Sequence, residues 1–252
     1  MCLLAFTFTP NQNRHLLLAA NRDEFHDRPA RPMAWWQWPD GALAGRDGKA
    51  GGTWLAVARN GRWAAVTNFR DPRAAPGGRS RGELPSGFVG GSESPADYTR
   101  RIYLDRAAYG PFNLLAGDRD SLWYCATHAG AKSVAPGVHA LSNGLLDEGW
   151  PKSRRVATAL GGLIADGRDI DPDRLFDLMN DRVPGNDAEL PDTGIGRDYE
   201  KVLSAPFIVT PRYGTRCTTV LDLGTSSQAV ERRFAPSGER SGEVRYTFNF
   251  LD

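Results

Sequence analysis

Cysteine at position 2 has the most distinctive potential chemistry in this 252-residue chain. If Met1 is removed, Cys2 carries a thiol and a free α-amine on one residue. Their reference pKa values, about 8.5 and about 8, lie close enough for the amine to accept the thiol proton near neutrality. Such a residue could be nucleophile and base together. The alternative is a small hydrophobic residue that starts a buried strand.

A second cluster of reactive side chains is the run Asn21-Arg22-Asp23-Glu24, which directly follows the apolar residues 15–20. Successive residues of a strand point to opposite faces, so Asn21 and Asp23 share one face and Arg22 and Glu24 the other. This arrangement places an amide, a guanidinium and two carboxylates at a sheet end. It indicates either a site or an ordinary turn that stops the strand.

Other polar residues lie at the ends of apolar runs. Asn68 and Asn143 each follow such a run, where a side-chain amide can donate to an oxyanion or cap a turn. The segment Gly51-Gly52-Thr53-Trp54 allows a close approach of the backbone to a ligand or to a packed helix, but it lacks the Lys and Ser/Thr of a phosphate-binding loop. Arg216 precedes a β-branched run.

The elements that must position these residues are strands at both ends of the chain with helices between them. The turn Asn60-Gly61 predicts a hairpin, and Ser94 followed by Pro95 predicts a helix start. Strands are expected over residues 3–9, 15–20, 53–58, 62–68, 112–116, 122–126, 138–141, 207–209, 217–223, 229–233 and 244–250. Helices are expected over residues 80–89, 95–108, 152–165 and 171–180, and loops over residues 29–39 and 184–197. This order predicts one α+β domain over residues 1–252, with antiparallel sheets.

Composition excludes several classes of protein. The 31 basic residues nearly cancel the 30 acidic ones, so we expect no nucleic-acid partner. No apolar run approaches the roughly 18 residues of a membrane span. Neither the three cysteines nor the four histidines have metal-ligand spacing, and the chain opens without a basic-then-apolar leader. We therefore expect a cytoplasmic protein without a metal or another cofactor.

Eight short motifs occur in a fixed order from residue 2 to about residue 223. The motifs are Met1-Cys2, Asn21-Arg22-Asp23-Glu24, Gly51-Gly52-Thr53-Trp54, Thr67-Asn68, Ser80-Arg81-Gly82, Phe112-Asn113-Leu114-Leu115 with Gly117-Asp118, Leu141-Ser142-Asn143, and Tyr213-Gly214-Thr215-Arg216. Together they resemble the NRDE family, also called the transport and Golgi organisation family.

The resemblance implies a fold and a set of roles. The family is similar to distant N-terminal nucleophile hydrolases, nearest the cysteine branch of penicillin V acylases and bile-salt hydrolases, which implies a four-layer αββα sandwich. Cys2 would then be the nucleophile, and Asp23 would orient its α-amine. Asn143, together with Asn68, would stabilise the oxyanion. Arg216 would anchor a substrate carboxylate or tune the thiol.

One position departs from that branch. The branch has an arginine where this chain has Ala20, whereas here the arginine is Arg22, two residues or roughly 6.6 Å further along the same strand face. We expect Arg22 to belong to the catalytic group, and Asn21 and Trp54 to contact the substrate.

Three functions follow as hypotheses. The first is hydrolysis of a small-molecule amide or thioester through Cys2. The second is a non-enzymatic carrier of an apolar, lipid-like or haem-like cargo, which a pocket lined by Trp35, Trp36 and Trp38 would favour, although such residues also pack in cores. The third is an interaction protein whose motif residues only hold the fold.

Overall fold

The computed structural model describes residues 2–39, 41–74, 77–167 and 170–250, so Met1 lies outside the described residues. The strands are β1 (Cys2–Phe8), β2 (Arg14–Phe25), β3 (Ala30–Trp35), β4 (Ala42–Asp47), β5 (Leu55–Ala58), β6 (Trp63–Asn68), β7 (Phe112–Gly117), β8 (Leu122–Ala126), β9 (Ala129–Ser133), β10 (Gly137–Leu141), β11 (Tyr213–Gly224), β12 (Ser227–Phe234) and β13 (Arg240–Phe248). The α-helices are α1 (Glu83–Val89), α2 (Pro95–Leu104), α3 (Pro151–Ala165), α4 (Pro172–Met179) and α5 (Arg197–Val202), and the 3-10 helices are η1 (Arg106–Ala108) and η2 (Asp187–Glu189).

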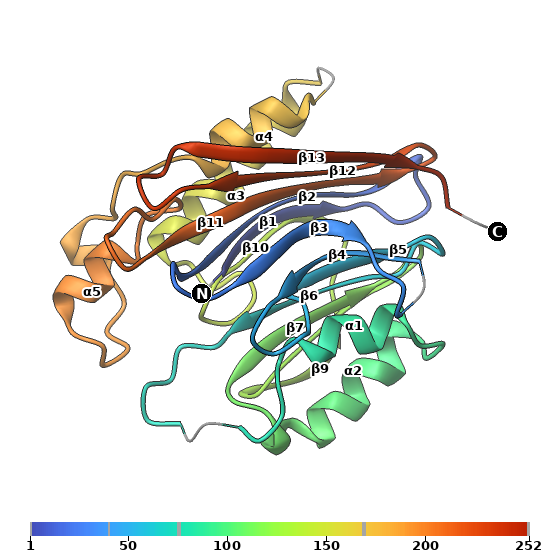
Figure 1. Cartoon of the computed structure of the whole chain (residues 1–252), viewed down its shortest axis with the longest axis horizontal. Helices are drawn as coiled ribbons and strands as arrows, with labels where there is room; N and C mark the ends of the chain where they lie inside the picture. Colours follow the sequence, from blue (N-terminus) through green and yellow to red (C-terminus); the bar gives the residue numbers. More distant parts are fainter. Residues whose placement is uncertain (1, 40, 75–76, 168–169, 251–252) are drawn as a thin grey trace.

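These strands form two antiparallel sheets. The first sheet has the order β10-β1-β2-β11-β12-β13, and the second has the order β3-β4-β5-β6-β7-β8-β9. Figure 1 shows the two sheets stacked on each other, with α3 and α4 beside the first sheet and α1 and α2 beneath the second. The layer order is therefore helix, sheet, sheet, helix, which confirms the α+β class and the expected αββα sandwich.

Three apolar clusters hold the four layers together. The cluster between the sheets contains Leu4, Phe6, Leu16, Leu18, Trp63, Leu115 and Tyr124. The cluster between the first sheet and its helices contains Leu3, Ala5, Leu17, Ala19, Val156, Leu160, Phe176 and Met179. The cluster between the second sheet and its helices contains Ala56, Ala64, Leu114, Leu84, Phe88 and Ile102.

β1 and β2 contain the continuous apolar runs 2–6 and 16–20, because both faces of these strands are covered there. Every residue of β1 is buried. Along β1, Leu4 points between the sheets and Leu3 points toward the helices, so the alternation also places Cys2 between the sheets. In register, Cys2 lies directly opposite Arg22 of β2.

Local signals predicted several element ends correctly. Ser94 accepts a hydrogen bond from the Asp97 amide (3.1 Å), and Asp171 caps α4 by accepting one from the Asp173 amide (2.9 Å). The Asn60-Gly61 turn joins β5 to β6, and Gly61 has φ of 81°, which glycine adopts without strain.

Three local expectations are wrong, and two strands were not expected. Residues 29–39 contain β3, which accommodates Pro32 because it is an edge strand with a register shift after Arg31. Residues 184–197 contain η2 and the first residue of α5, and residues 207–209 form no strand beyond an isolated bridge from Val209. β4 and β9 were not predicted because Ala42–Asp47 and Ala129–Ser133 contain no β-branched or aromatic residue.

Candidate active site

A cavity of about 650 Å³ lies where the ends of the two sheets meet, and side chains from both sheets line it. Six of the residues expected in the site line this cavity together: Cys2, Arg22, Asp23, Trp54, Asn68 and Arg216. They come from β1, β2, the segment before β5, the end of β6, and β11. The fold therefore brings together motifs that lie more than 200 residues apart in the chain.

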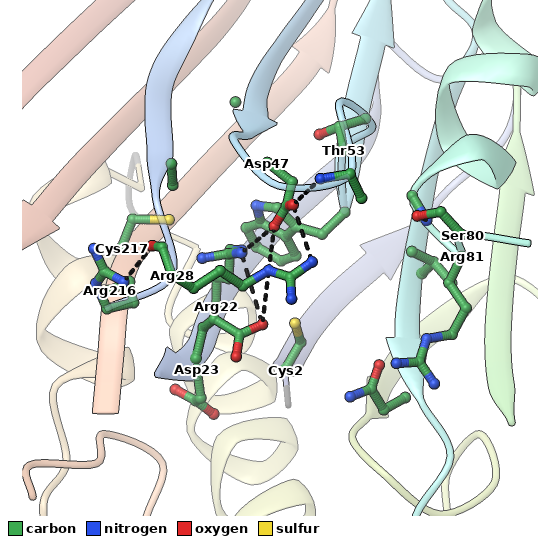
Figure 2. A pocket seen from close by; sticks show the side chains of 18 of the residues that line it. Cys2, Arg22, Asp23, Arg28, Asp47, Thr53, Ser80, Arg81, Arg216 and Cys217 are labelled. Atoms are coloured by element: carbon green, nitrogen blue, oxygen red, sulfur yellow. Dashed lines mark hydrogen bonds and ion pairs between the residues drawn. The ribbon is translucent and has the colours of Figure 1, made fainter. Parts of the chain in front are cut away.

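Cys2 lines this cavity and is buried, since the residue is 7% exposed. Figure 2 shows it pointing toward the group formed by Arg22, Arg28 and Asp47. Burial raises the pKa of the Cys2 thiol, and the Arg22 guanidinium opposes that shift. A thiol held in its protonated form needs a base close by before it can attack a carbonyl carbon.

Arg22 is held in place by carboxylates on the cavity side of β2. Its Nη2 donates to Asp47 Oδ2 (3.1 Å) and lies 3.8 Å from Glu24 Oε2. Arg28 donates to both Asp47 oxygens (2.6 and 3.0 Å). Burial raises the pKa of Asp47, but the hydrogen bonds from Arg28 and the Ala50 amide, together with the charges of Arg28 and Arg22, outweigh it and hold that pKa below its ordinary value.

The second Arg22 nitrogen, Nη1, is buried and has no hydrogen-bond partner within the described residues. Ala20, the position where the cysteine hydrolase branch has its arginine, pairs with Leu4 inside the core between the sheets. The two-residue displacement therefore moves the guanidinium from the core to a point directly opposite Cys2. An unpartnered cationic donor beside a thiol is suited to an oxygen that gains negative charge.

Asp23 points to the other face of β2, as the alternation predicted. Thr215 Oγ1 donates to its Oδ1 at 2.7 Å, and Figure 2 shows its carboxylate pointing away from Arg22 and Asp47. Burial raises the pKa of Asp23, and the ammonium of Lys152 opposes this shift. Asp23 is thus a shielded carboxylate close to the start of β1.

Arg216 reaches the cavity because of a β-bulge. The register of β11 shifts between Thr215, opposite Asp23, and Cys217, opposite Arg22, so Arg216 is the extra residue. A bulge re-aims side chains, and here Arg216 and Cys217 both line the cavity although they are adjacent in sequence. Arg216 Nη1 donates to the main-chain carbonyls of Phe25 (2.7 Å) and Arg28 (3.1 Å).

Arg81 belongs to the Ser80-Arg81-Gly82 motif but was not expected in the site, and it lies across the cavity in Figure 2. Its Nη1 donates to the Pro111 carbonyl (3.0 Å), and burial lowers its pKa. The turn that carries it is pressed against Gly52, because a Cβ on Gly52 would lie 2.5 Å from the Gly82 carbonyl carbon and oxygen. The backbone of the Gly51-Gly52 segment therefore lies close to the Ser80-Arg81-Gly82 turn, as expected for a packed segment. The Thr53 amide also donates to the Gly82 carbonyl oxygen (3.0 Å).

Replacing Gly52 with alanine should therefore lower the free energy of unfolding by about 1–3 kcal/mol, because backbone must move to admit the methyl group. Gly161 in α3 is the matched control: a Cβ there meets nothing within 4 Å, so Gly161→Ala should be neutral or stabilise the helix by up to about 1 kcal/mol. Urea unfolding of both variants measures the two values. Equal stability of the two variants would contradict this account of the turn.

Comparison with known proteins identifies the family of this chain. The model of the Transport and Golgi organisation 2 family matches residues 1–236. The chain belongs to this family. The Transport and Golgi organization protein 2 homolog of Bos taurus is 34% identical over 242 residues, and the Transport and Golgi organization 2 homolog of Mus musculus is 33% identical over 246 residues; each alignment covers 88% of both chains.

The resemblance read from the eight motifs is thereby confirmed.

Among solved structures, the Caenorhabditis elegans orthologue of N-acylethanolamine-hydrolyzing acid amidase aligns with 88% of this chain and 92% of its own, with a TM-score of 0.43 and 8% sequence identity. A likeness of that degree carries no argument about the function of this chain.

In this Transport and Golgi organisation 2 chain, two expected site residues do not belong to the cavity lining. Asn21 Nδ2 donates to the main-chain carbonyls of Met179 and Pro206 (both 2.9 Å), and its Oδ1 accepts from Thr218. Asn143 Nδ2 donates to the Asn68 carbonyl at 2.9 Å. Asn21 ties the first sheet to its helix layer, away from the cavity, and Asn143 holds the end of β6.

Some motif residues of the family form a buried polar network between the sheets. Asn113 Nδ2 donates to Thr67 Oγ1 (3.0 Å) and to the Gly144 carbonyl (2.9 Å), and Tyr124 donates to Asn113 Oδ1 (2.7 Å). Ser142 Oγ donates to the Cys2 carbonyl (3.3 Å). This network anchors the start of β1 to the second sheet, which gives those residues a structural role.

The side chains of Trp35, Trp36 and Trp38 lie outside the described cavity lining. Trp35 packs on Tyr246 and Phe248, Trp36 donates to the Ala44 carbonyl, and Trp38 is 81% exposed. The cavity lining includes Trp54 but none of these three.

Within the described residues, no group of three or more His, Cys, Asp and Glu side chains is arranged to hold a metal ion. No helix in that part of the chain is both long and apolar enough to cross a membrane.

Proposed function

We propose that this chain is a cysteine hydrolase of the N-terminal nucleophile type that cleaves an amide or a thioester of a small molecule. The observation that carries the proposal is the position of Cys2. Its thiol faces a cavity large enough for a small substrate, directly opposite the Arg22 guanidinium, with the buried Asp23 carboxylate close to the start of the same strand.

The reaction starts after Met1 is removed and the α-amine of Cys2 is free. The amine accepts the thiol proton, and the sulfur attacks the substrate carbonyl carbon. The bond from that carbon to the leaving nitrogen or sulfur breaks, and the leaving group takes the proton from the amine. Water, deprotonated by the same amine, then attacks the thioester on Cys2 and releases the acid and the thiol. Asp23 holds the amine in position throughout.

Two donors are available to the oxyanion of the intermediate. Arg22 supplies its unpartnered Nη1, and Asn68 supplies its side-chain amide from the cavity wall. Asn143 acts as a positioning residue, since its hydrogen bond holds the main chain of Asn68. Arg216 anchors a substrate carboxylate, and Trp54 contacts the substrate.

The charge of the cavity argues against an apolar cargo. Its described lining contains eight arginines and five Asp or Glu residues, which an apolar ligand would have to desolvate. We place the reaction in the cytosol, where the free cysteines Cys2, Cys125 and Cys217 stay reduced.

The test is to offer the processed protein a panel of N-acyl amides and acyl thioesters and to look by mass for an acyl adduct on Cys2. We expect an adduct with at least one member, together with release of its acid. Absence of both adduct and turnover, with tight stoichiometric binding of an apolar ligand that survives Cys2→Ala, would support the carrier function instead.

A further inference from the structure

Lys152 is a buried cation whose position the fold does not explain. It lies in the first turn of α3, directly after Pro151, and its side chain is 1% exposed. Its Nζ has no hydrogen-bond partner within the described part of the chain. A cation at a helix N-terminus is opposed by the helix dipole, and burial of an ammonium costs several kcal/mol. Stability alone would favour an apolar residue here.

The charged groups that face Lys152 come from several elements. Asp23 of β2 is the strongest influence that favours its charged form, and Cys2 of β1 and Glu200 of α5 also favour it, whereas Arg70 opposes it. Burial outweighs these attractions and lowers the pKa of Lys152 to about 8, so it is still mostly protonated at neutral pH. Tyr213, buried and near Asp23, has its pKa raised well above the usual value and stays neutral.

Lys152, Asp23, Arg70 and Glu200 form a cluster of charged groups in which the ion pairs are unevenly distributed. Arg70 Nη1 binds Glu200 Oε2 at 2.5 Å, and Thr193 donates to Glu200 Oε1 through its amide and its hydroxyl. Glu200 is thereby engaged with Arg70, which leaves Asp23 as the carboxylate that balances Lys152. Asp23 and Glu200 balance Lys152 and Arg70 in charge, and Glu24 and Arg22, which also act on Cys2, add one charge of each sign. These six groups are therefore neutral before the α-amine of Cys2 is counted.

We propose that Lys152 is a positioning residue for Cys2. Its ammonium balances the negative charge of the Asp23 carboxylate, and this keeps the α-amine of processed Cys2 in the neutral form that can accept a proton. A protonated α-amine would add an unbalanced cation to these desolvated groups, and like charges at close range disfavour each other. This inference rests on the proposed function, because it assigns the α-amine as the base.

The experiment titrates that amine directly. In a Cys2→Ser background, which keeps the amine and removes the competing thiol, trace acetylation with acetic anhydride is measured from pH 5 to pH 10 against phenylalanine amide as the internal standard. The acetylated N-terminal peptide is quantified by mass. Lys152→Met should move the half-maximal labelling of residue 2 to higher pH by on the order of one unit. Lys152→Arg, which keeps the charge, should leave it close to the parent value.

The outcomes separate the two proposals. A side chain that only fills space would change the labelling rate at every pH without moving the midpoint, so an unmoved midpoint in folded Lys152→Met overturns this inference alone. If Lys152→Met does not fold, Lys152→Gln takes its place, and the labelling midpoint is expected to shift in the same way. Retention of Met1 in the intact mass overturns both proposals. A shifted midpoint without hydrolysis of any substrate overturns the proposed function and leaves the role of Lys152 standing.

Discussion

Replacing Cys2 with alanine is expected to lower turnover of the acyl substrate by about 10⁴-fold or more, with the protein still folded. The thiol is the group that forms the covalent intermediate, and the neighbouring donors have no nucleophile to replace it. The methyl of alanine fits the site because Cys2 is already part of the core between the sheets. Initial rates on the substrate that gives the adduct measure the loss, and a thermal melt checks the fold.

Cys217 is the matched control for Cys2. Both residues pair with Arg22, from opposite sides of β2, and both line the cavity. Two strand spacings, roughly 9.6 Å, separate their backbones, which is too far for a disulfide without backbone movement. Burial raises the pKa of Cys217 well above its usual value, and no role is proposed for its thiol. Cys217→Ala should keep most of the activity; equal losses in the two variants would refute Cys2 as the specific nucleophile.

Asp23→Asn is expected to reduce turnover by roughly 10²–10⁴-fold, the usual contribution of a positioned base, while the melting temperature changes by no more than about 4 °C. The amide oxygen can still accept from Thr215, so local packing is kept. The lost charge is the one that orients the α-amine. Steady-state rates and a thermal melt on the same preparation test both halves of the expectation.

Glu231 supplies the control for Asp23. It is also a buried carboxylate in the cavity lining with its pKa raised by burial, but it accepts a hydrogen bond from the Met33 amide (2.9 Å) and lies on β12. Glu231→Gln should keep turnover within a few-fold. A large melting shift in Asp23→Asn with unchanged turnover would assign Asp23 to the fold rather than to the reaction.

Local sequence predicted the parts of the site that depend on one strand. The alternation along residues 21–24 correctly separated Arg22 and Glu24 from Asn21 and Asp23, because side chains of a strand must alternate. Alternation does not predict which layer of the structure covers each face of the strand. Asn21, expected to meet a substrate, instead donates to two carbonyls on the helix side.

Two residues carried no local signal of a role in the site. Arg81 and Lys152 lie near helix starts, and they gain significance only because the Arg81 turn lines the cavity and the Lys152 ammonium lies near Asp23 and Cys2. β4 and β9 form because neighbouring strands offer unpaired backbone groups, not because their own residues favour strands.

The sequence by itself determined the antiparallel α+β pattern, the helix caps and the candidate nucleophile, since each depends on residues within a few positions of one another. Only the tertiary structure decided that Arg22 lies opposite Cys2, that Asn143 supports Asn68, and that Lys152 lies beside Asp23. Strand register and sheet packing determine those neighbours, and both depend on burying the apolar faces of all four layers at once.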